Sequence, residues 1–273
     1  MERLKYQTKG PIMAADLDRY TIKTVERAFQ ILDYASEQSR PVSIQDINVA
    51  LDINTNMTFR LLASLLNSGY MSKDDSTGLY SVSLKSLRLS RNALQSIEIR
   101  KICMPYLELL WNFFPKANAN MAVYYQQDVL VIDRIDSLSL PRTYFTPGRT
   151  LPFHCTGLGK ILTCTLEENE IDQLIKDKGL KQYTLQTITT PEGIKEELYK
   201  VRSEQVARDR NEFISGDNCS AVPIYGRGNK IIAGLSISAL QPYMSSEEVE
   251  AAIPKLRETA MKISYTMGFN EGI

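Results

Sequence analysis

The N-terminal part of the chain carries apolar residues at helical spacing in three successive segments. Over residues 22–37 they recur at every third or fourth position, which predicts an amphipathic helix. Ser43 can cap a second, short helix, and Asn54 or Thr55 can cap a third that stops at Gly69. A tight turn separates the last two, so the predicted order is helix, helix, turn, helix.

Two short alternating segments follow these helices. Residues 70–73 and 79–83 alternate around a polar turn of Asp, Ser, Thr and Gly, which is typical of a β-hairpin. Helices and hairpin in this order predict a winged helix-turn-helix, the motif whose last helix lies in the major groove of DNA.

Helical spacing returns over residues 84–114, where Pro105 is expected to break or kink the helix. Strands and helices then alternate. One hairpin is predicted over residues 121–135 and a second over residues 219–240, and a single long helix over residues 246–267 closes the chain. Three further helices are expected between the hairpins, at residues 157–165, 167–177 and 191–205.

The predicted fold class is α+β, with two folded domains. The boundaries that the pattern suggests are a flexible N-terminal arm at 1–20, a winged helix-turn-helix domain at 21–84, a linker helix at 85–100 and a second domain at 101–273.

Composition narrows the class of protein only slightly. Lys plus Arg equals Asp plus Glu at 32 each, so net charge neither supports nor excludes a nucleic-acid partner. No apolar run is long enough to span a bilayer and the first residues lack a signal-peptide core, so we expect a cytoplasmic protein without a membrane partner. The four cysteines lack CxxC spacing and are expected to be thiols.

The third predicted helix has the residue types that groove recognition requires, with short polar side chains early and apolar residues behind them. Double-stranded DNA is therefore the expected partner, and a small helical module that binds another protein is the alternative. The candidate DNA-contacting residues are Arg27, Ser43, Asn54, Thr55, Asn56, Thr58, Arg60 and Lys73.

The stretch "LPFHCTGLGKIL", residues 151–162, contains the only histidine of the chain. His154 and Cys155 are adjacent, so on an extended strand they point to opposite sides and do not form a catalytic pair. A metal site built from these two with Asp209 and Cys219 lacks close ligand spacing. The glycines do not match a phosphate-binding loop either. A hydrogen-bonded histidine and a packed thiol are the favoured interpretation, and no cofactor is expected.

A binding pocket explains more of this region. Gly157 and Leu158 open a helix whose free amides can receive an anion. Ser236 and Ser238 lie two apart on a strand, so both hydroxyls face one side. These groups suit a small carboxylate with further hydroxyl or keto oxygens, although serines on a half-solvated strand would give the same pattern.

Two sets of motifs resemble one known family. "TVERAFQILDYASE" and "SIQDINVALDINTNMTFRLLASLLNSGYM" are similar to the winged helix-turn-helix of the IclR family of bacterial transcription regulators. "LPFHCTGLGKIL" and "ARDRNEFISGDNCSAVPIYGRGNKIIAGLSIS" resemble two motifs of that family's second domain. The likeness extends over residues 20–268.

The resemblance implies a GAF-like second domain that binds a small effector, an organic acid or sugar-acid derivative. It also implies a homodimer or homotetramer on a partly palindromic operator, acting as repressor of a catabolic operon. Asp217 stands where the family is commonly apolar, which suggests a more polar effector. A cytosolic metal- or cysteine-dependent hydrolase with a helical appendage is the alternative. The effector-binding residues that the resemblance implies are Leu140, Thr143, Leu151, Gly157, Leu158, Asp209, Asp217, Cys219, Ser236 and Ser238.

Overall fold

A computed structural model describes residues 21–137 and 145–270. The predicted arm at residues 1–20 and the candidates Leu140 and Thr143 lie outside the described residues. The chain divides into two compact units, Met1–Asn92 and Ala93–Ile273.

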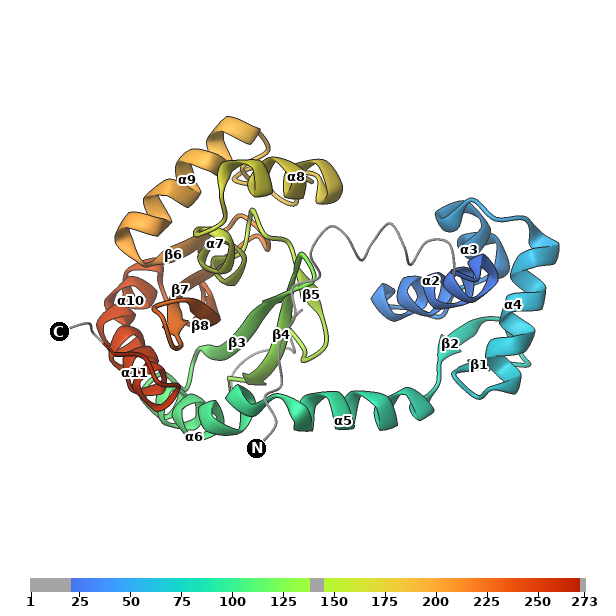
Figure 1. The fold of residues 1–273 in the computed structure, drawn as a ribbon, viewed down its shortest axis with the longest axis horizontal. Helices are drawn as coiled ribbons and strands as arrows, with labels where there is room; N and C mark the ends of the chain where they lie inside the picture. Colours follow the sequence, from blue (N-terminus) through green and yellow to red (C-terminus); the bar gives the residue numbers. More distant parts are fainter. Residues whose placement is uncertain (1–20, 138–144, 271–273) are drawn as a thin grey trace. The chain divides into compact units, whose positions relative to one another are not determined.

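The first unit has the predicted order of three helices and a hairpin (Figure 1). Its hairpin strands are antiparallel, with Ser72 opposite Ser81. One hydrophobic core joins all three helices to the hairpin, with Ile31, Ile47 and Leu62 among its buried side chains. The elements of this unit are α2 (Lys23–Glu37), α3 (Ile44–Leu51), α4 (Thr55–Asn67), β1 (Met71–Lys73) and β2 (Tyr80–Val82).

Local capping explains why the helices of this unit begin where they do. The Ser43 hydroxyl accepts the Asp46 N–H at 3.1 Å while the Asp46 carboxylate accepts the Ser43 N–H at 2.9 Å, which is a complete capping box. The Asn54 side chain accepts the Met57 N–H at 2.9 Å and starts α4. Both predicted caps are therefore confirmed.

The expected break at Pro105 is wrong. A 3₁₀ turn (Leu84–Ser86) leads into α5 (Leu87–Ser96), and α6 (Glu98–Phe113) follows after an interruption at Ile97. Pro105 lies inside α6 on its exposed side. Water can hydrate the carbonyl that loses its partner there, so the helix tolerates the proline.

The second unit is built on a six-stranded antiparallel sheet with strand order β5-β4-β3-β8-β7-β6. The expected single C-terminal helix is wrong, because it is divided at Ala252, and Pro254 sits in the first turn of the second part, where its missing N–H costs little. The remaining elements are β3 (Asn118–Tyr125), β4 (Asp128–Ile135), β5 (Thr150–Leu151), α7 (Gly157–Thr163), α8 (Glu168–Lys178), α9 (Pro191–Glu204), β6 (Ala207–Arg210), β7 (Asp217–Tyr225), β8 (Ile231–Leu240), α10 (Ser246–Ala251) and α11 (Ile253–Thr266).

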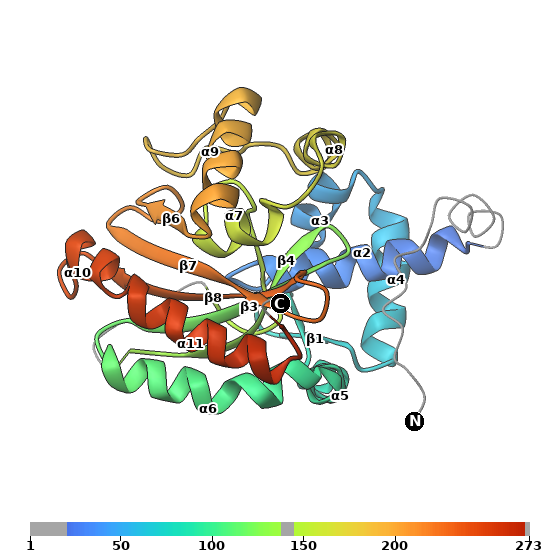
Figure 2. The ribbon, with the colours of Figure 1, turned by 60° about the vertical axis from the view of Figure 1, so that its left-hand side comes forward.

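Helices cover both faces of this sheet (Figure 2). α6, α10 and α11 pack on one face around a first core, and α7 packs on the other face with α8 and α9 outside it. A Cβ at Gly234 would lie 2.9 Å from Leu158 Cδ2, so α7 rests directly on β8. The predicted α+β class is confirmed. Among the described residues, no helix has the length and apolar character that a membrane crossing requires.

Candidate functional sites

The early, outer face of α4 is polar and open to solvent. Asn54, Thr55, Asn56 and Arg60 are exposed there. Thr58 does not belong to this face, because its side chain is fully buried and its hydroxyl donates to Asn48 Oδ1 at 2.6 Å. The expected DNA contact through Thr58 is therefore wrong. Its buried hydroxyl instead connects α4 to α3.

The other candidate DNA contacts surround α4 with different local tasks. The Arg27 guanidinium donates to the Leu51 carbonyl at 3.1 Å and so ties α2 to the end of α3. Ser43 caps α3, as described above. Lys73 is exposed on β1, with its Nζ 5.8 Å from the centre of the Tyr80 ring. Lys73 thus offers a charge to solvent, whereas Arg27 also holds the helices together.

The candidates of the second unit form a row across the sheet. Strand register places Asp209 opposite Cys219, Cys219 opposite Ser238, and Ser238 opposite Asn118. Paired residues of neighbouring strands project from the same face. A polar row therefore runs over β6, β7, β8 and β3, and Ser236 extends it by one step along β8. We call these residues, with Asn120 and Asp217 beside them, the polar row.

The polar row is closed to solvent. Asp209, Asp217 and Cys219 are each at most 4% exposed, and Ser236 and Ser238 at most 1%. Asp217 precedes Cys219 by two positions on β7 and therefore shares its face. The structure thus brings five of the predicted effector-binding residues together.

The start of α7 touches one end of this row. A Cβ at Gly157 would lie 3.1 Å from Cys219 Sγ and 3.2 Å from Ala221 Cβ, so glycine permits the close approach. Leu158 and Leu151 are buried in the apolar core beside the row. These two leucines line an apolar boundary and offer no polar side-chain group.

Burial changes the charge of the row. Burial raises the pKa of Asp209 to about 8, although its Oδ1 accepts the Glu212 N–H at 2.7 Å. Burial likewise raises the pKa of Asp217 to about 7, partly opposed by the positive charge of Arg134. The pKa of the Cys219 thiol is also raised by burial. Near neutral pH the row can therefore hold protons and present hydroxyl-like groups to an organic anion.

The chemistry-bearing residues of "LPFHCTGLGKIL" have packing roles. His154 is buried, and its Nε2 lies 3.0 Å from the Lys181 carbonyl oxygen. Cys155 is fully buried, and burial raises the pKa of its thiol, which disfavours the nucleophilic thiolate. The interpretation as a hydrogen-bonded histidine and packed thiol is confirmed. In the two described ranges, no three His, Cys, Asp or Glu side chains gather closely enough to hold a metal ion.

Lys160, in the same stretch, was not predicted to have a role. It is fully buried, and its ammonium group donates to Glu212 at 2.6 Å, the Arg208 carbonyl at 2.9 Å and Glu197 at 3.1 Å. These bonds join α7 to α9 and to the loop that contains Glu212, whose N–H donates to Asp209. Lys160 therefore positions the wall of the polar row.

The sequence pattern did not indicate three polar residues of β3 and β4 that lie at this site. Asn118 and Asn120 lie on the face of the polar row, and Arg134 is opposite Asn120 in the register. Arg134 Nη1 donates to the Phe145 carbonyl at 3.1 Å, and its Nε pairs with Asp136. The alternation Asn-Ala-Asn before Met121 was the available indication, since it places two amides on one strand face.

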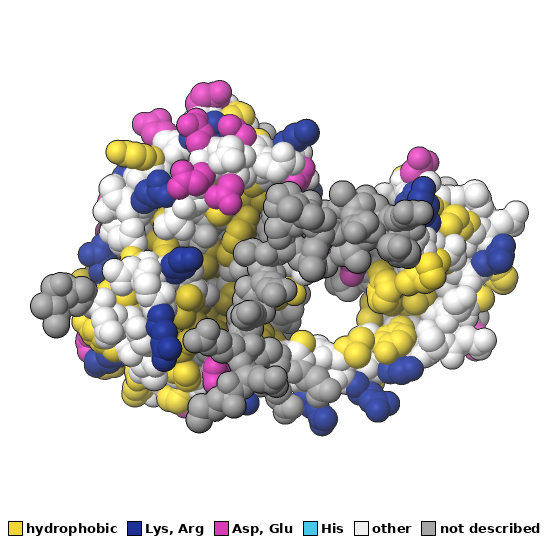
Figure 3. Space-filling view, viewed as in Figure 1, with side chains coloured by type: hydrophobic (Ala, Val, Ile, Leu, Met, Phe, Trp, Pro, Cys, Tyr) yellow, Lys and Arg dark blue, Asp and Glu magenta, His cyan; other side chains and the backbone are white. Residues whose placement is uncertain are grey.

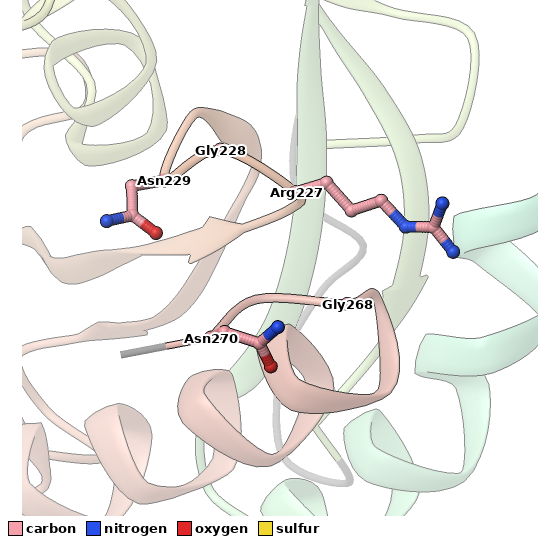
Figure 4. Close-up of a pocket in the computed structure, with 5 residues that line it drawn as sticks. All are labelled: Arg227, Gly228, Asn229, Gly268 and Asn270. Carbon is pink, nitrogen blue, oxygen red and sulfur yellow. The ribbon is translucent and has the colours of Figure 1, made fainter. Parts of the chain in front are cut away.

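A surface pocket lies away from this row. It is lined by residues of the β7–β8 turn and of the segment after α11 (Figure 4). That turn is at the opposite end of β7 from Asp217 and Cys219, and the Arg227 side chain points away from Asn229. The polar row provides more convergent polar groups, so we take the row and not this pocket as the candidate ligand site.

Comparison with known proteins matches both parts of the chain to models of one family. The family model for the IclR helix-turn-helix domain matches residues 24–75, and that for the bacterial transcriptional regulator IclR C-terminal domain matches residues 91–265. The chain belongs to the IclR family of bacterial transcriptional regulators. It is thus a DNA-binding regulator whose family acts in transcription and not in enzyme catalysis, and nothing in the comparisons supports a hydrolase.

Individual relatives extend along nearly the whole chain. The HTH-type transcriptional regulator KdgR of Escherichia coli is 29% identical over 260 residues, covering 94% of this chain and 98% of the relative. The E. coli repressor AllR is 26% identical over 246 residues, covering 90% of each. An IclR homologue from Microbacterium hydrocarbonoxydans in complex with 4-hydroxybenzoate has a TM-score of 0.71 at 18% identity, covering 90% of this chain and 99% of that one, which shows a shared fold.

Proposed function

We propose that this IclR-family regulator is a homo-oligomeric repressor of a catabolic operon. A small organic acid or sugar-acid derivative bound at the polar row changes its affinity for the operator. AllR, a relative along most of the chain, is named a repressor. The Microbacterium homologue of the same fold holds 4-hydroxybenzoate, an aromatic hydroxy acid.

The proposed DNA-binding surface is the exposed face of α4. Asn54, Thr55 and Asn56 meet base edges or phosphates, and Arg60 meets a guanine or a phosphate. Phosphate contacts are proposed for Arg27, Ser43 and Lys73, since the Ser43 hydroxyl accepts one bond and still has its own proton to donate.

Basic side chains continue beyond the reading helix. Lys85, Arg88 and Arg91 are exposed at and along α5, where Figure 3 shows Lys and Arg side chains. The proposed operator contacts of one chain include only a few positive charges. Tight binding then requires two copies on two half-sites, and it should weaken as salt is raised.

The observation that carries the effector proposal is the burial of Asp209, Cys219 and Ser238 in one cross-strand row. Buried polar groups without full mutual pairing favour a ligand that supplies the missing hydrogen bonds. Regulation further requires that the effector bind more tightly to one arrangement of the DNA-binding units than to another. Gly157, Leu158, Leu151, Asp217 and Ser236 complete the proposed site, and Leu140 and Thr143 remain proposed members.

A gel-shift experiment tests both halves of the proposal. The DNA is the region upstream of the regulator's own gene, and organic acids are added singly to the complex. The double variant Asp209→Ala/Ser238→Ala should retain the DNA and lose its response to the acid that releases the wild type. A normal response by the double variant would place the effector site elsewhere. Light scattering on the purified protein checks whether it is a dimer or a tetramer.

A further inference from the structure

Asn120 is a buried amide in the centre of the second unit's sheet. It is fully buried on β3, directly opposite Ser236. Its Nδ2 donates long hydrogen bonds to Ser236 Oγ at 3.4 Å and to Ser238 Oγ at 3.3 Å. Among the described residues its Oδ1 has no hydrogen-bond partner. One side of the amide therefore lacks the bond that a buried polar atom requires.

This deficit does not depend on how the amide is turned. Exchanging oxygen and nitrogen would let both serines donate to Oδ1 and would leave Nδ2 without its partner. Buried polar groups without partners destabilise a folded chain. An apolar side chain of similar size would suit the surroundings, because Ala122 and Ala221 on the same face belong to an apolar core.

The neighbouring asparagine shows the contrast. Asn118 lies two residues earlier on the same face of β3, and its Oδ1 accepts the Ser137 N–H at 2.9 Å. That bond holds the chain after β4 to the sheet, which is a structural task. Within the described ranges, Asn120 makes no such bond to the backbone, so its polarity needs another explanation.

We propose that Asn120 is a specificity-determining residue of the effector site, whose amide binds a hydroxyl of a hydroxylated organic acid. This inference rests on the proposed effector function of the polar row. The amide also holds the Ser236 and Ser238 hydroxyls in position for the same ligand. A hydroxyl can donate and accept, so it satisfies the free amide atom in either orientation, whereas a keto oxygen only accepts.

The rest of the row fits a ligand with several oxygens. Asp209 and Asp217 stand on the β6–β7 side of Asn120, and Arg134 stands on its β4 side. Phe145 and Phe213 form an edge-to-face pair at 6.1 Å between ring centres. The Phe145 carbonyl accepts from Arg134, and the Phe213 N–H donates to Asp209 at 3.4 Å. The aromatic pair thus connects the segment bonded to Arg134 with the segment bonded to Asp209.

Two matched substitutions separate ligand binding from packing. Asn120→Leu removes the amide and keeps a side chain branched at Cγ, so the free protein should unfold at the same or a higher temperature than wild type. Asn118→Leu removes the acceptor of the Ser137 N–H, so its unfolding temperature should fall. Differential scanning fluorimetry of the full chain measures both. A loss of thermal stability in Asn120→Leu as large as that in Asn118→Leu would overturn the assignment, because it would make the amide a packing residue.

Calorimetric titration of the same proteins tests the ligand class. The probes are paired acids with and without hydroxyls: gluconate against hexanoate, and 4-hydroxybenzoate against benzoate. Wild type should bind one hydroxylated member about tenfold or more tightly than its partner, and Asn120→Leu should lose that preference. The smaller variant Asn120→Ala also lacks the amide and should show the same loss of preference. Binding of neither hydroxylated acid, or an unchanged preference in both variants, would overturn the inference.

The double variant Asp209→Ala/Ser238→Ala distinguishes a wrong role for Asn120 from a wrong effector site. If it loses the hydroxylated acid while Asn120→Leu binds normally, the effector site stands and the role of Asn120 fails. If it binds normally as well, the proposed effector site itself is wrong.

Discussion

The two units of this regulator place their candidate functional residues in opposite environments. In the first unit Thr55, Asn56 and Arg60 are exposed on α4, where water solvates them in the free protein. In the second unit Asp209 and Ser238 are almost entirely buried. Exposed polar groups cost the fold little, whereas buried ones couple binding to stability and to pH.

This difference fits the two kinds of partner. A large charged duplex can meet only a surface, and its phosphates attract exposed side chains over a distance. A small acid can be enclosed, so its contacts are made by groups already removed from water. Substitutions on the exposed face of α4 should therefore change affinity with little effect on stability, while those among the buried groups of the second unit should change stability as well. Four predictions test this contrast, from the largest expected effect to the smallest.

Lys160→Met should cause the largest loss. The substitution leaves Glu212 and the Arg208 carbonyl without their buried donor, so the free energy of unfolding of the second unit should fall by about 3–5 kcal/mol. Urea denaturation measures the change. Lys178→Met is the control, because the Lys178–Asp128 pair at 2.6 Å is half-exposed and should contribute about 0–1 kcal/mol. Equal losses in the two variants would contradict the distinction between buried and exposed charges.

Asp209→Asn should change how stability depends on pH. The pKa of Asp209 rises from 3.8 to about 8 on folding, so the stability linked to its proton is complete below 3.8 and is lost as pH rises through about 8. The variant carries no proton to lose and keeps an oxygen for the Glu212 N–H. It should therefore be close to wild type in stability at pH 4 and clearly more stable than wild type at pH 9, measured by denaturation.

Asp177→Asn, at an exposed position of α8, serves as the control for that comparison. Its stability should follow the wild-type pH curve. If Asp209→Asn also followed the wild-type curve at every pH, Asp209 would not be the group that causes the pH dependence of stability.

Arg60→Ala should weaken operator binding and leave the fold intact. One lost base or phosphate contact corresponds to about 1–3 kcal/mol of binding free energy per copy. Because the side chain is exposed, the unfolding temperature should stay unchanged. Gel-shift titration checks affinity, with Ser64→Ala one turn further along α4 as the control. Undiminished binding by Arg60→Ala would remove this residue from the proposed interface.

Ser43→Ala should have the smallest effect, about 1 kcal/mol of stability in the first unit, because it removes the side-chain acceptor of the Asp46 N–H. Ser36→Ala, near the end of α2, removes only an exposed hydroxyl that bonds the Asp33 carbonyl, and should change less. Thermal unfolding compares them. A larger loss from Ser36→Ala would contradict the capping argument.

Features that depend on residues close together in the sequence could be predicted, whereas those that depend on distant residues could not. Ser43 and Asn54 were recognised as caps because a cap bonds residues only two or three positions away. The strand of Asn118 and Asn120 was predicted to begin later, at Met121, since two amides look like the polar residues of a loop. Thr58 was expected on the solvent face because its side chain is polar. The hydrogen bond that allows it to be buried is made to Asn48, which belongs to another helix.

The sequence by itself determined the order of most elements, though not the short strands β5 and β6, and it determined the caps and the family. These depend on local periodicity and on motifs in fixed order. The tertiary structure decided which polar residues face water and which face the interior. Strand register brought Asp209, Cys219 and Ser238 into one row although they are far apart along the chain. Packing of α7 and the sheet then removed that row from water. Register and burial are properties of distant contacts, and local periodicity carries no information about either.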